Sequence, residues 1–116
     1  EADEIVICDT GSSDRTIDII KQYNVKLLNI HVSPWRFDDA RNISLSFVPL
    51  DVDVCVCVDL DEILSPGWRQ AIERVWIPNK TTKLKYKYNK IPVTILIKIG
   101  TTLKTKKKLN IKLFFF

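Results

Sequence analysis

Short runs of apolar residues alternate with polar turns and amphipathic segments along the first 78 residues of this chain. Short segments rich in apolar or β-branched residues between turn signals are typical of strands, and they occur at Glu4–Cys8, Val25–Val32 and Val54–Val58. Helical spacing predicts helices at about 14–23, 38–48 and 65–76. Because strands and helices alternate with short connections, we expect parallel β-α-β units and an α/β fold.

Residues that favour helix starts and core positions refine this prediction. Ser12 or Ser13 is predicted to cap the first helix, Asp38 or Asp39 the second, and Ser65 the third, with Pro66 at its first turn. The residues expected to face the core from these three helices are Ile17, Ile20 and Tyr23, then Phe37, Ala40, Ser44 and Phe47, and then Ala71, Ile72 and Val75.

The pattern changes after residue 79. Thr82–Tyr88 alternates apolar residues with lysines, which is typical of a half-exposed strand, and Ile91–Ile99 is a second apolar run with a proline near its start. Residues 101–116 are rich in lysine and predict no helix or strand. We therefore expect residues 1–89 to form an α/β domain with a mainly parallel sheet, and residues 90–116 to form a Lys-rich β or irregular tail.

Charge is divided unequally between these two parts. All 14 acidic residues lie between Glu1 and Glu73, and residues 79–116 hold 11 lysines and no acid. Residues 1–78 hold seven Lys and Arg against those 14 acids, a net −7, and the remainder nets +11. A basic arm of this kind can bind nucleic acid or an anionic surface. The tail has no arginine and no groove-reading motif, so we expect no specific nucleic-acid partner.

The three cysteines and the apolar runs indicate in which cellular compartment the protein is expected. Cys8, Cys55 and Cys57 fall in predicted strands, where they are expected to be small buried hydrophobic residues of a protein in a reducing compartment. The run Ile91–Ile99 is too short to cross a bilayer, and the sequence predicts no signal peptide and no transmembrane span. We expect a cytoplasmic protein, with peripheral association at the inner membrane as a further option.

Candidate chemistry lies at two strand ends. The turn Asp9–Asp14 follows the first predicted strand, Gly11 permits a close backbone approach, and the following helix N-terminus offers N–H groups to an anion. Asp59-Leu60-Asp61-Glu62 follows the strand Val54–Val58 directly. Open α/β sheets place their ligands at the carboxyl ends of the strands, so both segments are expected at that edge. Taken alone, each is also explained as an ordinary polar turn.

Carboxylates and an arginine suggest which ligand this edge would take. Asp59 and Asp61 are two residues apart, so in an extended chain they point the same way. Mg²⁺ and Mn²⁺ prefer carboxylates, phosphates and water as ligands, so the pair predicts a seat for either ion with a diphosphate. Arg41, near the start of the second helix, is a candidate for bidentate phosphate contact. Taken alone, it is also explained as a surface arginine.

The order of these motifs resembles the family 2 glycosyltransferases, which are nucleotide-diphospho-sugar transferases with the GT-A fold. The stretches that carry the resemblance are Asp3–Asp14, Ala40–Asn42 and Asp59–Glu62, and it continues through Leu64–Trp68. The resemblance implies part of a Rossmann-like, three-layer α/β/α domain. It also implies metal-assisted transfer of a sugar from a nucleotide-diphosphate donor to the hydroxyl of a glycan, lipid or protein acceptor.

The resemblance also implies roles for individual residues. The substrate-binding residues would be Asp9, Thr10, Gly11, Asp14, Arg41 and Asp59. Asp59 and Asp61 would form the metal-binding DxD motif, in which Asp61 and the metal hold the diphosphate. Many family members have a second Asp after the first strand that contacts the base, and this chain has Thr10 there.

Two parts of the family pattern are not in this sequence. A strand and helix with further base contacts are expected before Glu1, and an acidic general base is expected well downstream of Asp61, but no acid follows Glu73. We therefore assign no catalytic residue and expect a truncated fragment that is inactive alone. The composition of residues 90–116 is what AT-rich codons give when read out of frame, so this tail is expected to be non-family sequence, frameshifted or disordered.

Two other classes of function stay open on the sequence. One is a non-catalytic, basic-tailed binding module for nucleic acid or an anionic surface. The other is a different doubly wound phosphate-handling domain, such as a receiver-like domain, which would need a lone phosphoacceptor aspartate and a lysine at a strand end.

Overall fold

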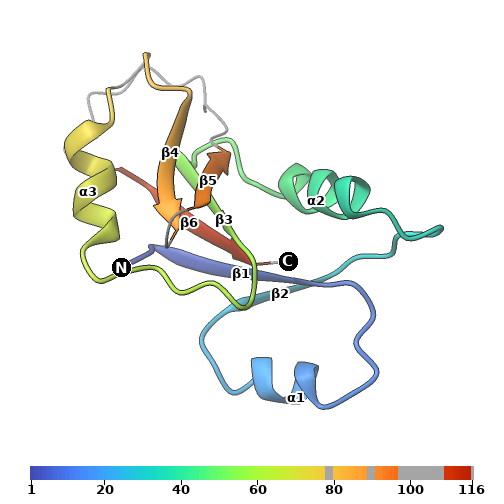
Figure 1. Cartoon of the computed structure of the whole chain (residues 1–116). Coiled ribbons are helices and arrows are strands. Elements are labelled where there is room, and N and C mark those ends of the chain that lie inside the picture. The colour runs from blue at the N-terminus through green and yellow to red at the C-terminus, as the bar shows by residue number, and fades with distance from the viewer. Residues whose placement is uncertain (78–79, 89–90, 97–108, 116) are drawn as a thin grey trace.

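A computed structural model describes residues 1–77, 80–88, 91–96 and 109–115. In this part of the chain, four strands form a sheet in the order β2-β1-β6-β3, and two further strands, β4 and β5, pair as a separate antiparallel sheet (Figure 1). All neighbouring strands of the larger sheet run parallel. The predicted α/β fold with a parallel sheet is therefore confirmed.

The boundaries of the elements agree with the sequence pattern most closely in the strands. The elements are β1 (Glu4–Asp9), α1 (Thr16–Ile20), β2 (Lys26–Asn29), α2 (Phe37–Ser46), β3 (Val54–Val58), α3 (Trp68–Val75), β4 (Lys83–Tyr88), β5 (Ile91–Leu96) and β6 (Ile111–Phe115). The strand β3 has the bounds that its run of β-formers predicts. Each helix is shorter than predicted, and the end of the predicted strand Ile91–Ile99 lies outside the described residues.

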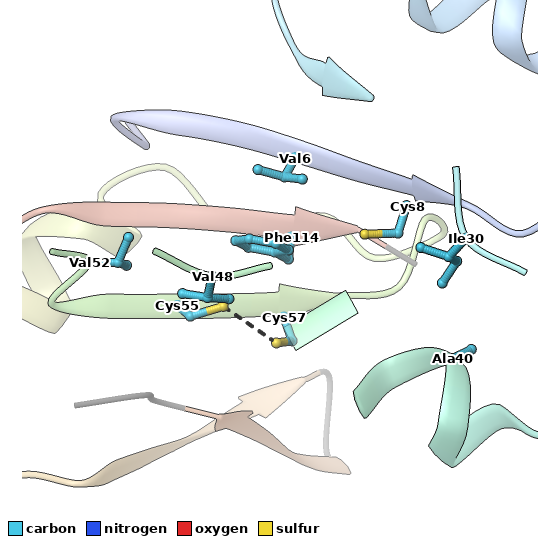
Figure 2. Close-up of a cluster of buried hydrophobic side chains, with 9 residues drawn as sticks. All are labelled: Val6, Cys8, Ile30, Ala40, Val48, Val52, Cys55, Cys57 and Phe114. Atoms are coloured by element: carbon cyan, nitrogen blue, oxygen red, sulfur yellow. Dashed lines mark hydrogen bonds between the residues drawn. The ribbon is translucent and has the colours of Figure 1, made fainter. Parts of the chain in front are cut away.

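Two hydrophobic clusters on opposite faces of β3 hold the sheet between helices. On one face, Cys55 and Cys57 pack in a cluster with Ala40 of α2 and Phe114 of β6, and Figure 2 shows these side chains. On the other face, the three valines of β3 pack in a cluster with Ile72 of α3. All three cysteines are buried and form no disulfide, in line with their expected role as core residues. The described chain is thus a helix–sheet–helix layer structure.

The strand β6 lies at the centre of the sheet, between β1 and β3 (Figure 1). No strand was predicted in residues 101–116, and the structure corrects this for Ile111–Phe115. Ile111 and Leu113 join the cluster against α3, and Phe114 joins the opposite cluster, as expected for side chains that alternate across a sheet. Lys112 interrupts the apolar pattern, and its ammonium pairs with Glu4 of β1. The division of the chain after residue 89 stays a prediction.

The buried stripes of the helices differ from the predicted ones. The helix α1 ends at Ile20, so Tyr23 lies beyond it and is exposed. In α2 only Ala40 and Ser44 are buried, and Phe37 and Phe47 are exposed. Two small residues one turn apart let the helix approach the sheet closely, and the Ser44 hydroxyl donates to the Ala40 carbonyl at 2.8 Å.

The helix α3 begins later than its predicted cap. Its N-cap is Gly67, at a φ of 84°, which is a left-handed conformation that glycine adopts without strain. The buried residues of α3 are Arg69 and Ile72, while Ala71 and Val75 are exposed. The stripe is rotated from the predicted one because Arg69 faces inward to bind polar groups at the starts of β1 and β6.

We expect Phe114→Ala to lower the free energy of unfolding by about 3–5 kcal/mol, because Phe114 is 0% exposed at the centre of the sheet. Urea unfolding followed by circular dichroism measures the loss. The matched control is Phe47→Ala, since Phe47 is 47% exposed and its loss should be much smaller. Equal losses in the two variants would contradict the central position of β6.

Candidate functional site

A cavity of about 200 Å³ opens where β1 and β2 end and α2 begins. Its lining consists of Thr10, Ile30, Trp35, Phe37, Ala40, Arg41 and Ser44. Thr10 follows β1 directly and Ile30 follows β2, so the cavity lies at the carboxyl edge of the parallel sheet. This is the edge at which open α/β sheets bind their ligands. The lining is largely apolar, with one guanidinium and two hydroxyl groups.

Asp9, the last residue of β1, closes the turn that follows it. Its carboxylate accepts hydrogen bonds from the Gly11 N–H at 3.0 Å, from the Ser12 N–H at 3.1 Å and from the Ser12 hydroxyl. The Ser12 hydroxyl, followed by the two backbone N–H groups, lowers the pKa of Asp9 against the opposing effect of burial. Asp9 is only 7% exposed, so its carboxylate shapes the turn, and Thr10 reaches the cavity.

The rest of the turn has a conformation that its residue types allow. Gly11 has a φ of 114°, where an L side chain would be strained. The Asp14 carboxylate accepts the Thr16 N–H at 2.9 Å, and the Thr16 side chain, followed by this N–H, lowers the pKa of Asp14. Asp14 therefore satisfies a donor at the start of α1, where Ser12 or Ser13 was predicted to act. It is not among the residues that line the cavity.

Arg41 joins the cavity to the end of β3. One guanidinium nitrogen lies 2.9 Å from Oδ1 of Asp59, across 18 residues of sequence, and the guanidinium carbon lies 4.8 Å from the centroid of the Phe37 ring. The side chains of Arg41 and Asp59 are 33% and 47% exposed. A half-exposed ion pair contributes little to stability, so it orients Arg41 toward the end of β3 without holding it there rigidly.

The Asp59–Glu62 segment forms a tight turn at the end of β3, in place of the extended chain in which Asp59 and Asp61 were expected to point the same way. The Glu62 N–H donates to the Asp59 carbonyl at 3.0 Å, and the Asp59 N–H donates to the Glu62 carboxylate at 3.0 Å. This reciprocal pair places Leu60 and Asp61 at the tip of the turn, where both are exposed. Asp61 therefore stands open to solvent beside the Arg41–Asp59 pair.

The donor atoms at this turn suit a hard divalent cation that brings further ligands with it. No group of three or more His, Cys, Asp or Glu side chains able to hold a metal occurs among the described residues. Mg²⁺ typically takes one or two carboxylates and completes its shell with water and substrate phosphates. Asp59 and Asp61 supply such a partial set of oxygen ligands, so their chemistry fits a metal that binds together with a diphosphate.

The structure brings some of the predicted site residues together and leaves others apart. Thr10 and Arg41 line one cavity, and Arg41 contacts Asp59. Asp9 and Gly11 support the same region through the turn. The sequence analysis placed Phe37 in the core and gave Trp35 and Glu62 no individual role at the site. The available signals were the aromatic residues just before the Ala40–Asn42 motif and the position of Glu62 directly after Asp61.

Comparison with known proteins identifies the family of the chain. The structure is an α/β layer protein with polar side chains at the carboxyl edge of its parallel sheet, which is the edge where open α/β sheets place their ligands. The sequence profile of Glycosyl transferase family 2 matches residues 1–82, and the chain belongs to this family. No solved structure matches the chain.

Membership of this family indicates the general function of the chain. The chain is a glycosyltransferase-type domain, and a nucleotide-sugar donor and an acceptor are its partners at the level of the family. Proteins of this family commonly use a divalent metal. Within the described residues, none of the helices has the length and apolar character needed to span a membrane.

We expect Ser12→Ala to raise the pKa of Asp9 toward its ordinary value, because it removes the hydroxyl that contributes most to the lowering. A lowered pKa stabilises the fold above the unfolded-state value of about 4, and this stabilisation is lost as pH falls through the folded-state value. The variant should therefore be roughly 1.5 kcal/mol less stable at pH 7, with a smaller difference at pH 3.

Urea unfolding at the two pH values measures this difference, and an NMR titration of the Asp9 carboxyl measures its pKa directly. Ser13→Ala is the matched control, since Ser13 lies exposed in the same turn. A stability difference that is the same at pH 3 and pH 7 would contradict this assignment.

Proposed function

We propose that this chain binds a nucleotide-diphosphate sugar donor at the carboxyl edge of its parallel sheet. The observation that carries the proposal is the 2.9 Å contact between Asp59 and Arg41, which lines the cavity. It places a guanidinium, a carboxylate and an enclosed, largely apolar space next to one another. A nucleotide-diphosphate sugar needs all three: an apolar wall for the base, a cation for phosphate, and a metal ligand.

The diphosphate would lie between Arg41 and the DxD turn. Arg41 presents a planar fork of N–H donors that suits phosphate oxygens, and Phe37 beneath it limits the positions of the guanidinium. Trp35 and Phe37 supply aromatic faces on the cavity wall, which suit the planar base. Thr10 offers a hydroxyl at the end of β1. We assign Asp9, Gly11 and Asp14 to the support of this surface.

Asp59 and Asp61 are the residues that would hold Mn²⁺ or Mg²⁺. Oδ1 of Asp59 accepts from Arg41, so we assign Oδ2 of Asp59 and the exposed carboxylate of Asp61 to the metal. When bound, such a metal neutralises the charge that develops on the leaving nucleoside diphosphate. Glu62 keeps the turn closed by accepting the Asp59 N–H.

We assign donor binding, and no efficient sugar transfer, to this chain by itself. The sequence has no acid after Glu73, so no downstream carboxylate of this chain deprotonates an acceptor hydroxyl. A glycan, lipid or protein hydroxyl is the acceptor class that the family implies. A reducing compartment such as the cytoplasm is part of the proposal, since all three cysteines of the chain are buried and none forms a disulfide.

Calorimetric titration with uridine diphosphate in the presence of Mn²⁺ tests the metal site. We expect Asp61→Asn to weaken this binding at least tenfold, because it removes a charged metal ligand. The same variant should bind no more weakly than wild type when Mn²⁺ is replaced by EDTA.

Asp18→Asn is the matched control, since Asp18 is an exposed acid on α1, away from the cavity. It should leave the Mn²⁺-dependent affinity unchanged. If the wild-type chain binds no uridine diphosphate, or Asp61→Asn binds it as tightly as wild type, the proposed function is wrong.

Arg41→Lys separates phosphate recognition from base recognition. Lysine keeps the positive charge but lacks the planar fork, so we expect about tenfold weaker binding of uridine diphosphate. Uridine itself should bind equally well to both proteins, since it carries no phosphate. An equal loss of affinity for uridine diphosphate and for uridine would show that Arg41 acts on the base or on the fold.

A further inference from the structure

The centre of the parallel sheet is a slot between β1 and β3 that β6 fills. The strand β6 pairs in parallel with both neighbours, from Glu4 opposite Lys112 on one side and from Val54 opposite Ile111 on the other. The side chains of Ile111 and Phe114 are fully buried. A strand in this slot therefore forms backbone hydrogen bonds along both edges and packs its side chains against both faces of the sheet.

Polar residues at the entrance of the slot recognise the backbone that leads into β6. Asp53 accepts the Asn110 N–H at 2.7 Å, and Asp3 accepts the Ile111 N–H at 2.8 Å. Arg69 of α3 donates to the Leu109 carbonyl at 2.7 Å. These contacts set the register of the strand, because a shift by one residue would break all of them and turn Phe114 to the other face.

Side chains add selectivity to this backbone recognition. The Lys112 ammonium pairs with Glu4 of β1, and the Asn110 amide donates to the Asp51 carbonyl at 3.0 Å. The remaining positions of β6 are apolar and enter the two hydrophobic clusters. The slot therefore fits a strand with the pattern Asn-apolar-Lys-apolar-apolar.

The ladder and polar partners of β6 do not come from β4 or β5, although Leu84 of β4 packs against the cluster that holds Ile111 and Leu113. The strands β4 and β5 pair with each other in their own sheet, and the ladder partners of β6 are β1 and β3. An identical Leu109–Phe115 segment from another copy would make the same contacts. Exchange of an identical element between copies is a low-cost route to a dimer.

We propose that the slot between β1 and β3 accepts Leu109–Phe115 from a second copy of this chain, so that two copies exchange β6. The length of chain before β6 permits this, since residues 97–108 separate it from β5 and twelve residues extend to about 40 Å. The exchange bears on the candidate site, because β6 stands between the strands that lead to Asp9 and Asp59. Each site would then be completed by the partner copy.

A pair of charge-reversed chains tests the proposal through the Glu4–Lys112 contact. One full chain carries Glu4→Lys and the other carries Lys112→Glu. Within either chain alone, like charges face each other when β6 lies in its own slot. In an exchanged pair of the two variants, opposite charges meet in both slots. One variant is labelled with ¹⁵N, so native mass spectrometry distinguishes the mixed dimer from dimers of one kind.

We expect the amount of mixed dimer in the mixture to be at least ten times the amount of dimer that either variant forms in a separate sample. A chain with both substitutions is the control, since its β6 meets an opposite charge in its own slot and should gain nothing from mixing. Dimer levels in the mixture equal to those of the separate variants would overturn the proposal.

Should either variant be unfolded alone, the same mixture gives the answer by circular dichroism. Exchange restores the folded spectrum when the two chains are mixed. Spectra that remain the average of the separate chains would overturn the proposal equally. The readout needs no donor or metal, so its outcome is distinguishable from failure of the proposed function.

Discussion

The parallel pairing of β6 with both β1 and β3 sets the spacing on which the candidate site depends. Neighbouring strands lie about 4.8 Å apart, so β1 and β3 are held about 10 Å apart by the strand between them. Asp9 ends β1 and Asp59 follows β3. Arg41 reaches Asp59 from α2, which packs on the same sheet. Any displacement of β6 would therefore change the distance between the turn after β1 and the DxD turn.

Charged residues hold the opposite end of the sheet, and Arg69 is the centre of this arrangement. Burial of a guanidinium is costly unless its donors are paired. Arg69 donates to Asp3 at 3.0 Å, to Glu73 at 2.9 Å and to the Leu109 carbonyl at 2.7 Å. One side chain on α3 thus ties the start of β1 to the start of β6, and this offsets the cost of its burial.

The sequence pattern predicted the elements whose structure depends mainly on their own residues. The strand β3 was predictable because five consecutive β-formers must be buried on both faces, and the contact between Arg41 and Asp59 follows from motifs that converge at one sheet edge. The position of β6 was not, since its pairing with β1 spans more than a hundred residues and Lys112 interrupts its apolar run. The exposure of Phe37 was missed because helical spacing alone does not reveal that a cavity replaces the core there.

The exposure of the Arg41–Asp59 pair explains how one arrangement serves both the empty and the loaded site. A pair with side chains 33% and 47% exposed contributes at most about 1 kcal/mol. In the proposed donor complex, Arg41 would turn from Asp59 toward a phosphate at little cost, and the Asp59 carboxylate would gain a divalent cation in exchange. A buried pair would resist this change, because separating its charges leaves each of them desolvated. The partial exposure of this pair is thus compatible with the proposed donor binding at this edge of the sheet.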